Sequence, residues 1–234
     1  MTNLSQNICT NCGETNPLYY TNCGKCKHYI RATVVNIDLW STFWRLFESP
    51  KKALVNIIYA EHKNFVSFLL IFLSTKLFIL SAFTQSLLEK NLPNSNYQFY
   101  NFLILFAIYT FSILFFVKLF TIINKKQKTR FKDNLAIVVY SFTPILFSLF
   151  FLTPVEYGIF GIHWFIFNPS PFIIKSNIAY VLVLFEGIMF IWSVVIIYKG
   201  FNLQTNSNKA PAVFTFLLYL MIVIEILFIP YILI

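Results

Sequence analysis

Five blocks of apolar residues, each long enough to cross a lipid bilayer as a helix, constrain this sequence more than any other feature. About 20 helical residues cross the roughly 30 Å of hydrocarbon in a bilayer. Charged residues make up only 12% of the chain, about half of the share that a soluble domain carries. The sequence therefore predicts an all-α polytopic membrane protein with a bundle of five transmembrane helices. The five blocks are residues 65–87, 100–123, 134–152, 177–199 and 211–233.

An additional aromatic stretch, residues 157–167, is too short to be a sixth span. Pro169 and Pro171 follow it and end any helix there. We expect this stretch to be interfacial or re-entrant, with Tyr157 and Trp164 at the level of the lipid headgroups.

Lys and Arg residues beside the blocks predict the orientation of the spans, because basic residues concentrate on the cytoplasmic side of a membrane. Fourteen of them flank the predicted spans on one side, and only Lys90 and Lys175 lie on the other. The N-terminus is therefore predicted to be cytoplasmic and the C-terminus to lie outside the cell (inner) membrane. The net charge of +9 is then a signal of topology and does not indicate nucleic-acid binding.

The densest group of these charges is a basic loop after the second block. It could hold anionic lipid headgroups or face a protein partner. Its residues are Lys125, Lys126, Lys128, Arg130 and Lys132.

All four cysteines lie near the N-terminus, as two C-x-x-C pairs with ten residues between them. This spacing is typical of a zinc ribbon, because each pair turns tightly enough to direct two thiolates at one ion. Gly13 and Gly24 stand where such turns need a free backbone. The predicted ligands are Cys9, Cys12, Cys23 and Cys26.

Two disulfides are the alternative interpretation of the four cysteines. They need an oxidising compartment, whereas the charge pattern predicts that this segment is cytoplasmic. Four thiolates leave no open position on the metal, so we expect one structural zinc ion with no catalytic role. His28 is expected to be a solvent-facing neighbour of the site.

Apolar residues recur at helical spacing between the cysteines and the first block, at Leu39, Trp40, Phe43, Trp44 and Phe47. Two arrangements fit this pattern: a helix in the cytoplasmic membrane interface, or a helix packed against the ends of the spans. A proline at position 50 ends it and begins a second helix. The predicted domains are a zinc ribbon (1–31), amphipathic helices (36–63) and a transmembrane domain (64–234).

Three ionisable residues lie well inside the predicted spans: Lys76, Glu186 and Glu225. Each costs about 2.5–3.5 kcal/mol at the centre of a bilayer, so each needs a partner. At about 1.5 Å per helical residue, all three lie roughly 16–21 Å from the cytoplasmic end. We expect one buried cluster, which is either a structural ion pair or a proton or ion relay.

A proline in the third block predicts a kink in that span. Pro144 cannot donate a hydrogen bond to the carbonyl oxygen of Tyr140. Ser141 and Thr143 stand where their hydroxyls could re-satisfy this part of the backbone.

Three short stretches of the sequence resemble the Yip-domain membrane proteins (the Ypt-interacting proteins). They are residues 47–52, residues 140–144, and residues 191–195 with 199–201 and the turn at 206–210. The resemblance implies five spans, a cytoplasmic N-terminus and a non-enzymatic role. Eukaryotic relatives bind Rab-type GTPases in vesicle trafficking, but their Asp-Leu-x-Gly-Pro element is not reproduced after Asp38-Leu39. A prokaryotic-type cell-membrane protein is therefore the better fit.

Motifs of common enzymes are absent from the sequence: it has no phosphate-binding glycine loop, H-E-x-x-H or G-x-S-x-G. We therefore predict a non-enzymatic scaffold or adaptor that recruits protein partners through the ribbon and the basic loop, with no small-molecule substrate. The alternative is a small transporter or channel-like protein that uses Lys76, Glu186 and Glu225. The sequence leaves the oligomeric state open.

Overall fold

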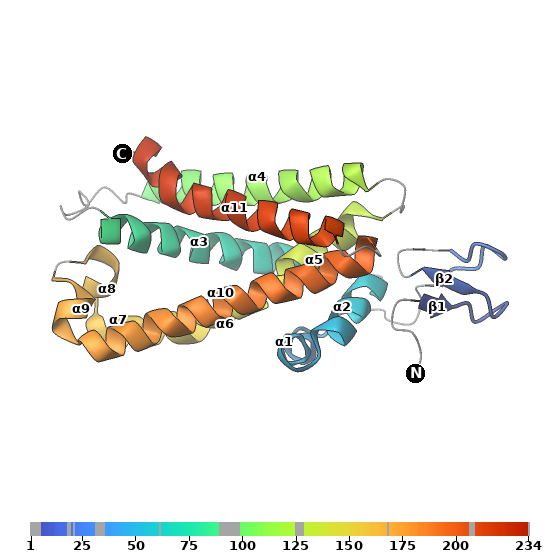
Figure 1. Cartoon of the computed structure of the whole chain (residues 1–234), viewed down its shortest axis with the longest axis horizontal. Coiled ribbons are helices and arrows are strands. Elements are labelled where there is room, and N and C mark those ends of the chain that lie inside the picture. The colour runs from blue at the N-terminus through green and yellow to red at the C-terminus, as the bar shows by residue number, and fades with distance from the viewer. Residues whose placement is uncertain are drawn as a thin grey trace. The chain divides into compact units, whose positions relative to one another are not determined.

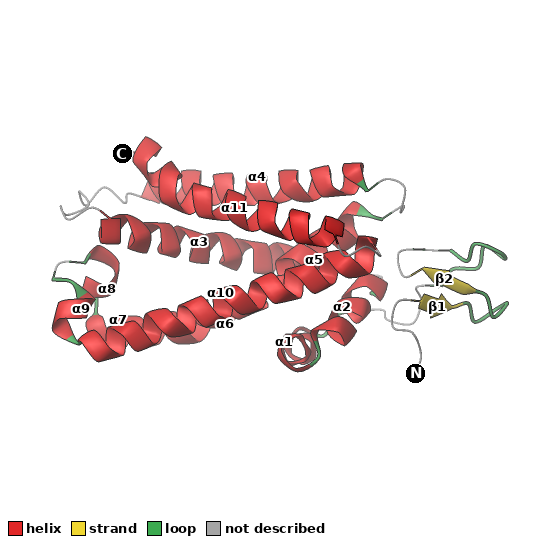
Figure 2. Cartoon of the chain, viewed as in Figure 1, coloured by secondary structure: helices red, strands yellow, loops and turns green. Residues whose placement is uncertain are grey.

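The structure is a computed structural model in which helices dominate (Figure 2). The chain forms two compact units. Unit 1 comprises Met1–Ser67, Leu114–Thr143 and Val194–Phe216, and unit 2 comprises Phe68–Ile113, Pro144–Ser193 and Leu217–Ile234. The described residues are 6–17, 20, 22–30, 36–60, 62–88, 99–124, 129–167, 169–205 and 209–233.

The N-terminal part folds around the cysteines. Strands β1 (Gln6–Ile8) and β2 (Thr15–Pro17) form an antiparallel hairpin in which Asn7 pairs with Asn16. The core of this part is Cys9, Cys23 and Ile30, with Cys12, Tyr20 and Cys26 packed against it. A core this small does not stabilise a domain by itself, which makes a bound metal the expected source of stability.

Two short helices follow, α1 (Leu39–Glu48) and α2 (Pro50–Tyr59). Asp38 caps α1 by accepting a hydrogen bond from the backbone N–H of Ser41. The side chains of Thr42 and Leu46 are buried, whereas those of Trp40 and Trp44 are 71% and 63% exposed. The two indoles therefore face away from the packed side of α1, which favours the interfacial arrangement.

Within the residues that the structure describes, five helical segments are long and apolar enough to cross a membrane, and this confirms the predicted fold class. Four of them belong to single helices, labelled in Figure 1: α3 (Val66–Leu88), α4 (Phe99–Ile123), α10 (Ser176–Thr205) and α11 (Lys209–Leu233). The remaining segment, Thr143–Phe160, combines α6 (Thr143–Phe147), a π-helical turn (Ser148–Leu152) and α7 (Thr153–Phe160).

The third span lies further along the chain than the sequence predicted. Residues 134–141 belong to the separate helix α5 (Phe131–Ser141), whose residues from Ala136 to Ser141 are fully buried in unit 1. Hydropathy alone does not distinguish such a buried helix from one that faces lipid, which explains the error.

The stretch 157–167 was also assigned wrongly in part. Its first four residues complete α7, and only the rest forms a connection that contains α8 (His163–Ile166), which α9 (Pro171–Ile174) follows. Tyr157 is exposed, but Trp164 is buried and packs against Phe160 and Phe83. Trp164 therefore belongs to a core cluster and is not an exposed interfacial anchor.

Pro144 lies in the first turn of α6, just after the break between α5 and α6 at Phe142. The hydroxyl of Thr143 donates a hydrogen bond to the carbonyl oxygen of Tyr140, the group that the missing N–H of Pro144 leaves free. The hydroxyl of Ser141, the other candidate, has no hydrogen-bond partner in the described part of the chain. One of the two hydroxyls thus satisfies the backbone at this break.

Gly200 lets α10 lie directly against α5 within unit 1. A Cβ atom at this position would overlap Cγ2 of Ile137 and would lie 3.6 Å from Cδ2 of Leu54. By contrast, a Cβ atom at Gly187, on the same helix, meets nothing within 4 Å. The close approach of α5 therefore requires glycine at position 200.

We predict that Gly200→Ala lowers the melting temperature of the detergent-solubilised protein. Overpacking costs about 1–3 kcal/mol, which exceeds the gain of about 1 kcal/mol from replacing glycine in a helix. Gly187→Ala is the matched control and should melt at the wild-type temperature or slightly above it. Equal melting temperatures for the two variants would contradict the packing argument.

Candidate functional site

The four cysteines form one cluster. Their sulfur atoms all lie within 4.8 Å of one another. The Sγ atoms of Cys9 and Cys26 are 3.6 Å apart, and those of Cys12 and Cys23 are 3.5 Å apart. Each short distance joins one C-x-x-C pair to the other, so the two pairs face a common centre.

The two C-x-x-C turns are built alike. The carbonyl oxygen of Cys9 accepts a hydrogen bond from Gly13, and that of Cys23 accepts one from Lys27. Gly13 and Lys27 both have a positive φ, of 71° and 61°. Gly24, which the sequence predicted to need backbone freedom, has no positive φ, because the equivalent position in the second turn is Lys27. This part of the prediction was wrong because glycine marks only one of the two left-handed positions.

Asn16, which was not predicted from the sequence, supports the cluster from strand β2. This buried side chain donates hydrogen bonds to Sγ of Cys23 (3.5 Å) and to the carbonyl oxygen of Glu14 (2.9 Å). Its Oδ1 accepts a hydrogen bond from the backbone N–H of Gly24 (2.8 Å). Asn16 thus joins the hairpin to the second turn and orients one ligand, as groups behind metal ligands commonly do.

The thiol pKa values show how the backbone prepares the cluster for a cation. Hydrogen bonds from the backbone N–H of Cys26, and then from Lys25 and Asn16, lower the pKa of Cys23 to about 6 against the effect of burial. The backbone N–H of Glu14 lowers the pKa of Cys12, but burial and the neighbouring thiols together raise it to about 12. Thiolates this close repel one another, so full deprotonation of all four needs a positive ion.

The donor set fits Zn²⁺. Four thiolates at about 2.3 Å from a zinc ion lie about 3.8 Å from one another in tetrahedral geometry, close to the short distances in this cluster. With four sulfur donors in place, no position remains for a substrate, so a zinc ion here would stabilise the ribbon and supply no catalysis. His28 is exposed and lies outside the set of four sulfur ligands.

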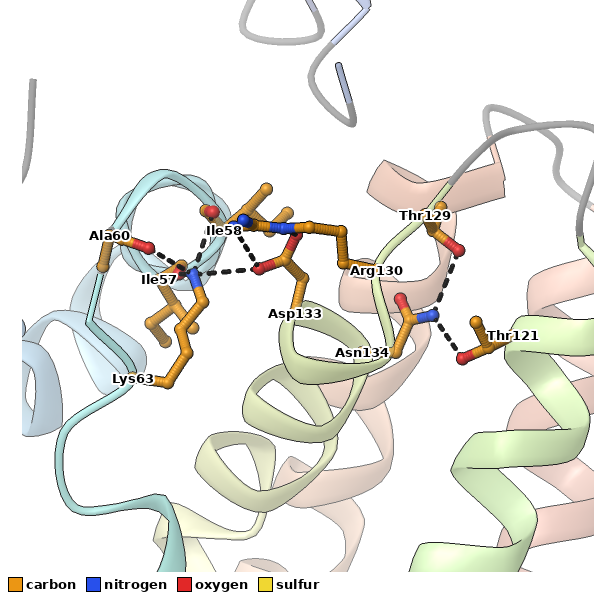
Figure 3. A network of polar contacts seen from close by, with 9 residues as sticks. All are labelled: Ile57, Ile58, Ala60, Lys63, Thr121, Thr129, Arg130, Asp133 and Asn134. Carbon is orange, nitrogen blue, oxygen red and sulfur yellow. Dashed lines mark hydrogen bonds and ion pairs between the residues drawn. The ribbon is translucent and has the colours of Figure 1, made fainter. Parts of the chain in front are cut away.

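A buried polar network joins the amphipathic helices to α5 within unit 1 (Figure 3). Lys63 donates hydrogen bonds to the carbonyl oxygens of Ile57, Ile58 (2.9 Å) and Ala60 (2.7 Å) at the end of α2. Its Nζ also lies 3.2 Å from Oδ1 of the buried Asp133. The ammonium group of Lys63 therefore caps the C-terminal end of α2 and forms an ion pair with the first turn of α5.

Asp133 and its neighbour Asn134 extend this network. Arg130 contacts both carboxylate oxygens of Asp133, each at 3.1 Å. Asn134 donates hydrogen bonds to Thr121 (2.9 Å) and Thr129 (3.1 Å), which ties α5 to the end of α4. From the sequence, Lys63 was interpreted only as a topology charge and Arg130 as part of the basic loop, and Asp133 was not identified.

Only part of the basic loop is described. Lys125, Lys126 and Lys128 lie outside the described residues, whereas Lys132 is exposed. Burial lowers the pKa of Arg130, but the interaction with Asp133 raises it, and the net effect is a raised pKa. The guanidinium therefore stays charged and bound to the network.

A second polar cluster lies within unit 2, inside the spans. Nζ of Lys76 on α3 is 2.7 Å from Oε1 of Glu186 on α10 and donates a hydrogen bond to Thr153 (3.0 Å). The hydroxyl of Ser148 lies 2.7 Å from each carboxylate oxygen of Glu186. Ser148 begins the π-helical turn and Thr153 follows it, and such turns frequently occur at functional sites.

The third member of this cluster differs from the prediction. Glu225 has Ser112 on α4 as its hydrogen-bonding neighbour. Instead, Glu156 on α7 interacts electrostatically with both Lys76 and Glu186. The third span predicted from the sequence ended at Leu152, which left Glu156 outside the membrane and outside the predicted cluster.

Comparison with known proteins places the chain in a family. The model of the Yip1 domain matches residues 44–232. The chain belongs to the Yip1 domain family. Searches of curated proteins and of solved structures gave no match. The Yip1 domain thus covers α1 from Trp44 onward and all five spans, whereas the cysteine cluster precedes it.

This match confirms the family resemblance seen in the sequence. Yip1 family proteins are membrane proteins and are generally not enzymes, in agreement with the absence of catalytic motifs. The Lys63 network and the Lys76 cluster both lie inside the Yip1 domain, and the four cysteines lie outside it.

We predict that the purified protein binds about one zinc ion per chain and that Asn16→Ala weakens this binding by about 10–100-fold, the usual effect of losing a group behind a metal ligand. A chelator competition titration with measurement of bound metal would show this. His28→Ala is the control and should bind zinc as the wild type does. Loss of zinc from His28→Ala, or unchanged affinity in Asn16→Ala, would contradict the four-cysteine site.

We predict that Asp133→Ala strongly destabilises the Yip1 domain, because removing one partner of a buried ion pair costs about 3–5 kcal/mol. The measurement is thermal unfolding of the solubilised protein. Lys132→Ala, an exposed neighbour on α5, should leave the melting temperature unchanged. If both variants melt like the wild type, the network adds nothing to stability.

Proposed function

We propose that this Yip1 domain protein is a non-enzymatic membrane scaffold that recruits protein partners through its ribbon and the basic loop of residues 125–132. It is a multi-pass protein of the cell (inner) membrane, with a cytoplasmic N-terminus and the C-terminus outside. The ribbon holds one structural zinc ion on Cys9, Cys12, Cys23 and Cys26.

The closed four-cysteine cluster is the observation that carries this proposal. A metal ion with no open coordination position stabilises the fold and the surface of the domain around it, and it catalyses no reaction. That surface exposes the side chains of Ile8 and Tyr29 and the basic Lys25 and Lys27. Because the loop of residues 125–132 is also basic, we expect the partner to present an acidic face.

Helix α1 holds the scaffold against lipid in this proposal. The exposed indoles of Trp40 and Trp44 suit the headgroup region of a membrane. Lys51 and Lys52, exposed at the start of α2, carry the charge that attracts anionic lipids on the cytoplasmic side. The amphipathic segment would then lie along the membrane between the ribbon and the first span.

A quantitative pull-down from native membranes tests the scaffold role. We predict that a specific partner of the wild type is lost in Cys9→Ser/Cys12→Ser and in Lys125→Ala/Lys126→Ala/Lys128→Ala, because the partner needs both the folded ribbon and the basic loop. His28→Ala, whose ribbon keeps all four ligands, should retain it. Membrane yield is measured for every variant, so that loss of the partner is separated from loss of protein.

An unchanged set of partners in both variants would contradict the scaffold proposal. The ribbon would then be only a local fold at the N-terminus. The transporter alternative would also need a different set of residues from the one predicted, because Glu156 takes the place of Glu225 beside Lys76 and Glu186.

A further inference from the structure

One positive and two acidic side chains meet inside unit 2, from three different helices. They are Lys76 on α3, Glu156 on α7 and Glu186 on α10. Lys76 and Glu156 are each only 1% exposed, and the side chain of Glu186 is 18% exposed. If all three were charged, the cluster would carry one uncompensated negative charge within the membrane, which is costly.

The ion pair of Lys76 and Glu186 accounts for one of the two acids. Both oxygens of Glu186 receive contacts: Oε1 from Lys76 and Ser148, and Oε2 from Ser148. The ammonium of Lys76 also donates to Thr153. This pair is therefore neutral as a unit and satisfied by hydrogen bonds.

Glu156 is the second acid of the cluster, and the ion pair of Lys76 and Glu186 does not neutralise it. Its Oε1 is fully buried and has no hydrogen-bond partner among the described residues. Its side chain also approaches those of Glu186 and Trp164. Two carboxylates that share one buried site repel each other, and a single proton removes this repulsion.

We propose that Lys76, Glu156 and Glu186 form an intramembrane proton-binding site, in which one proton is shared by the two carboxyl groups and resides mainly on Glu156. Glu186 is the ionised partner because it has the ammonium at 2.7 Å and the hydroxyl of Ser148 on both oxygens. The proton comes from water and returns to water, so no other reactant takes part. This site goes beyond the scaffold role and does not depend on it.

Release of the proton changes the net charge of the site from zero to one negative charge. Glu156 and Glu186 would then compete for the one ammonium of Lys76. This pair contacts Ser148, the first residue of the π-helical turn, and Thr153, the residue after the turn, and Glu156 follows on the same span. Protonation would thus be coupled to the local shape of the third span. Among the described residues, the charged groups that act on Glu156 are Lys76 and Glu186, and Trp164 contributes an indole that stays neutral.

Infrared spectroscopy of the full-length protein in nanodiscs tests this site, because a protonated carboxyl group has a C=O stretching band that a carboxylate lacks. Glu225 is another carboxyl group in the spans, so Glu225→Gln is the background for all samples. In this background, we expect a protonated-carboxyl band that disappears as the pH is raised. We predict that adding Glu156→Gln abolishes the band, and that adding Glu186→Gln does too, because Lys76 is then free to pair with Glu156.

The carboxyl band should respond only to changes in the two acids that share the proton. Glu48→Gln changes an exposed acid on α1 and should leave the band intact. Glutamine has the shape of a protonated glutamate, and melting curves of each variant confirm that it folds. Absence of the band from the Glu225→Gln background overturns the proposal without any further variant. Loss of the band in only one of the two site variants, or in neither, overturns it too, because the proton would then not be shared.

Discussion

Polar groups inside a bilayer must find their partners within the protein, and this constraint explains most of the irregular features of the Yip1 domain. Pro144 removes a backbone donor, and the hydroxyl of Thr143 replaces it at the carbonyl of Tyr140. A π-helical turn follows a few residues later, and the side chains at its two edges, Ser148 and Thr153, bind Glu186 and Lys76. The breaks in the third span therefore lie where its polar contacts are made. A regular helix would place these hydroxyls differently.

The same constraint operates at the ends of the helices. The last carbonyl groups of α2 have no partners within that helix, and the ammonium of Lys63 fills this need while it pairs with Asp133 at the start of α5. Gly200 lets α10 approach α5 in the same unit. Charge pairing and close packing thus both fix the position of α5. The start of this helix is too polar for a span, yet its residues from Ala136 to Ser141 are completely buried. The described part of the ribbon has only a small core around Cys9, Cys23 and Ile30, and its four sulfur atoms would do the equivalent work through a metal.

Patterns that repeat along the chain could be read from the sequence, whereas contacts between distant residues could not. Hydropathy and length predicted five spans, and the two C-x-x-C pairs predicted the cysteine cluster. The third span was misplaced because α5 is apolar for a different reason, since it packs against protein. Depth along a helix suggested that Glu225 joins Lys76 and Glu186, but depth does not say which way a side chain points around the helix. The residue types at positions 16 and 27 gave no sign of their roles. Asn16 acts through a hydrogen bond to Cys23, and Lys27 acts through its left-handed backbone conformation.

The boundary of the family match separates the two candidate sites. The Yip1 domain begins at Trp44 and contains the proton site, whereas the cysteine cluster lies entirely before it. Properties of the family therefore bear on Lys76, Glu156 and Glu186 but say nothing about the ribbon, whose role depends on its own surface. If the ribbon recruits a partner, it adds this capacity to the membrane domain. The Lys76 cluster contains no residue of the ribbon, whereas Arg130 of the Lys63 network interacts with Tyr29 of the ribbon. The ribbon and the cluster can then be changed independently, and loss of a partner in cysteine variants should leave the carboxyl band in the spans unaltered.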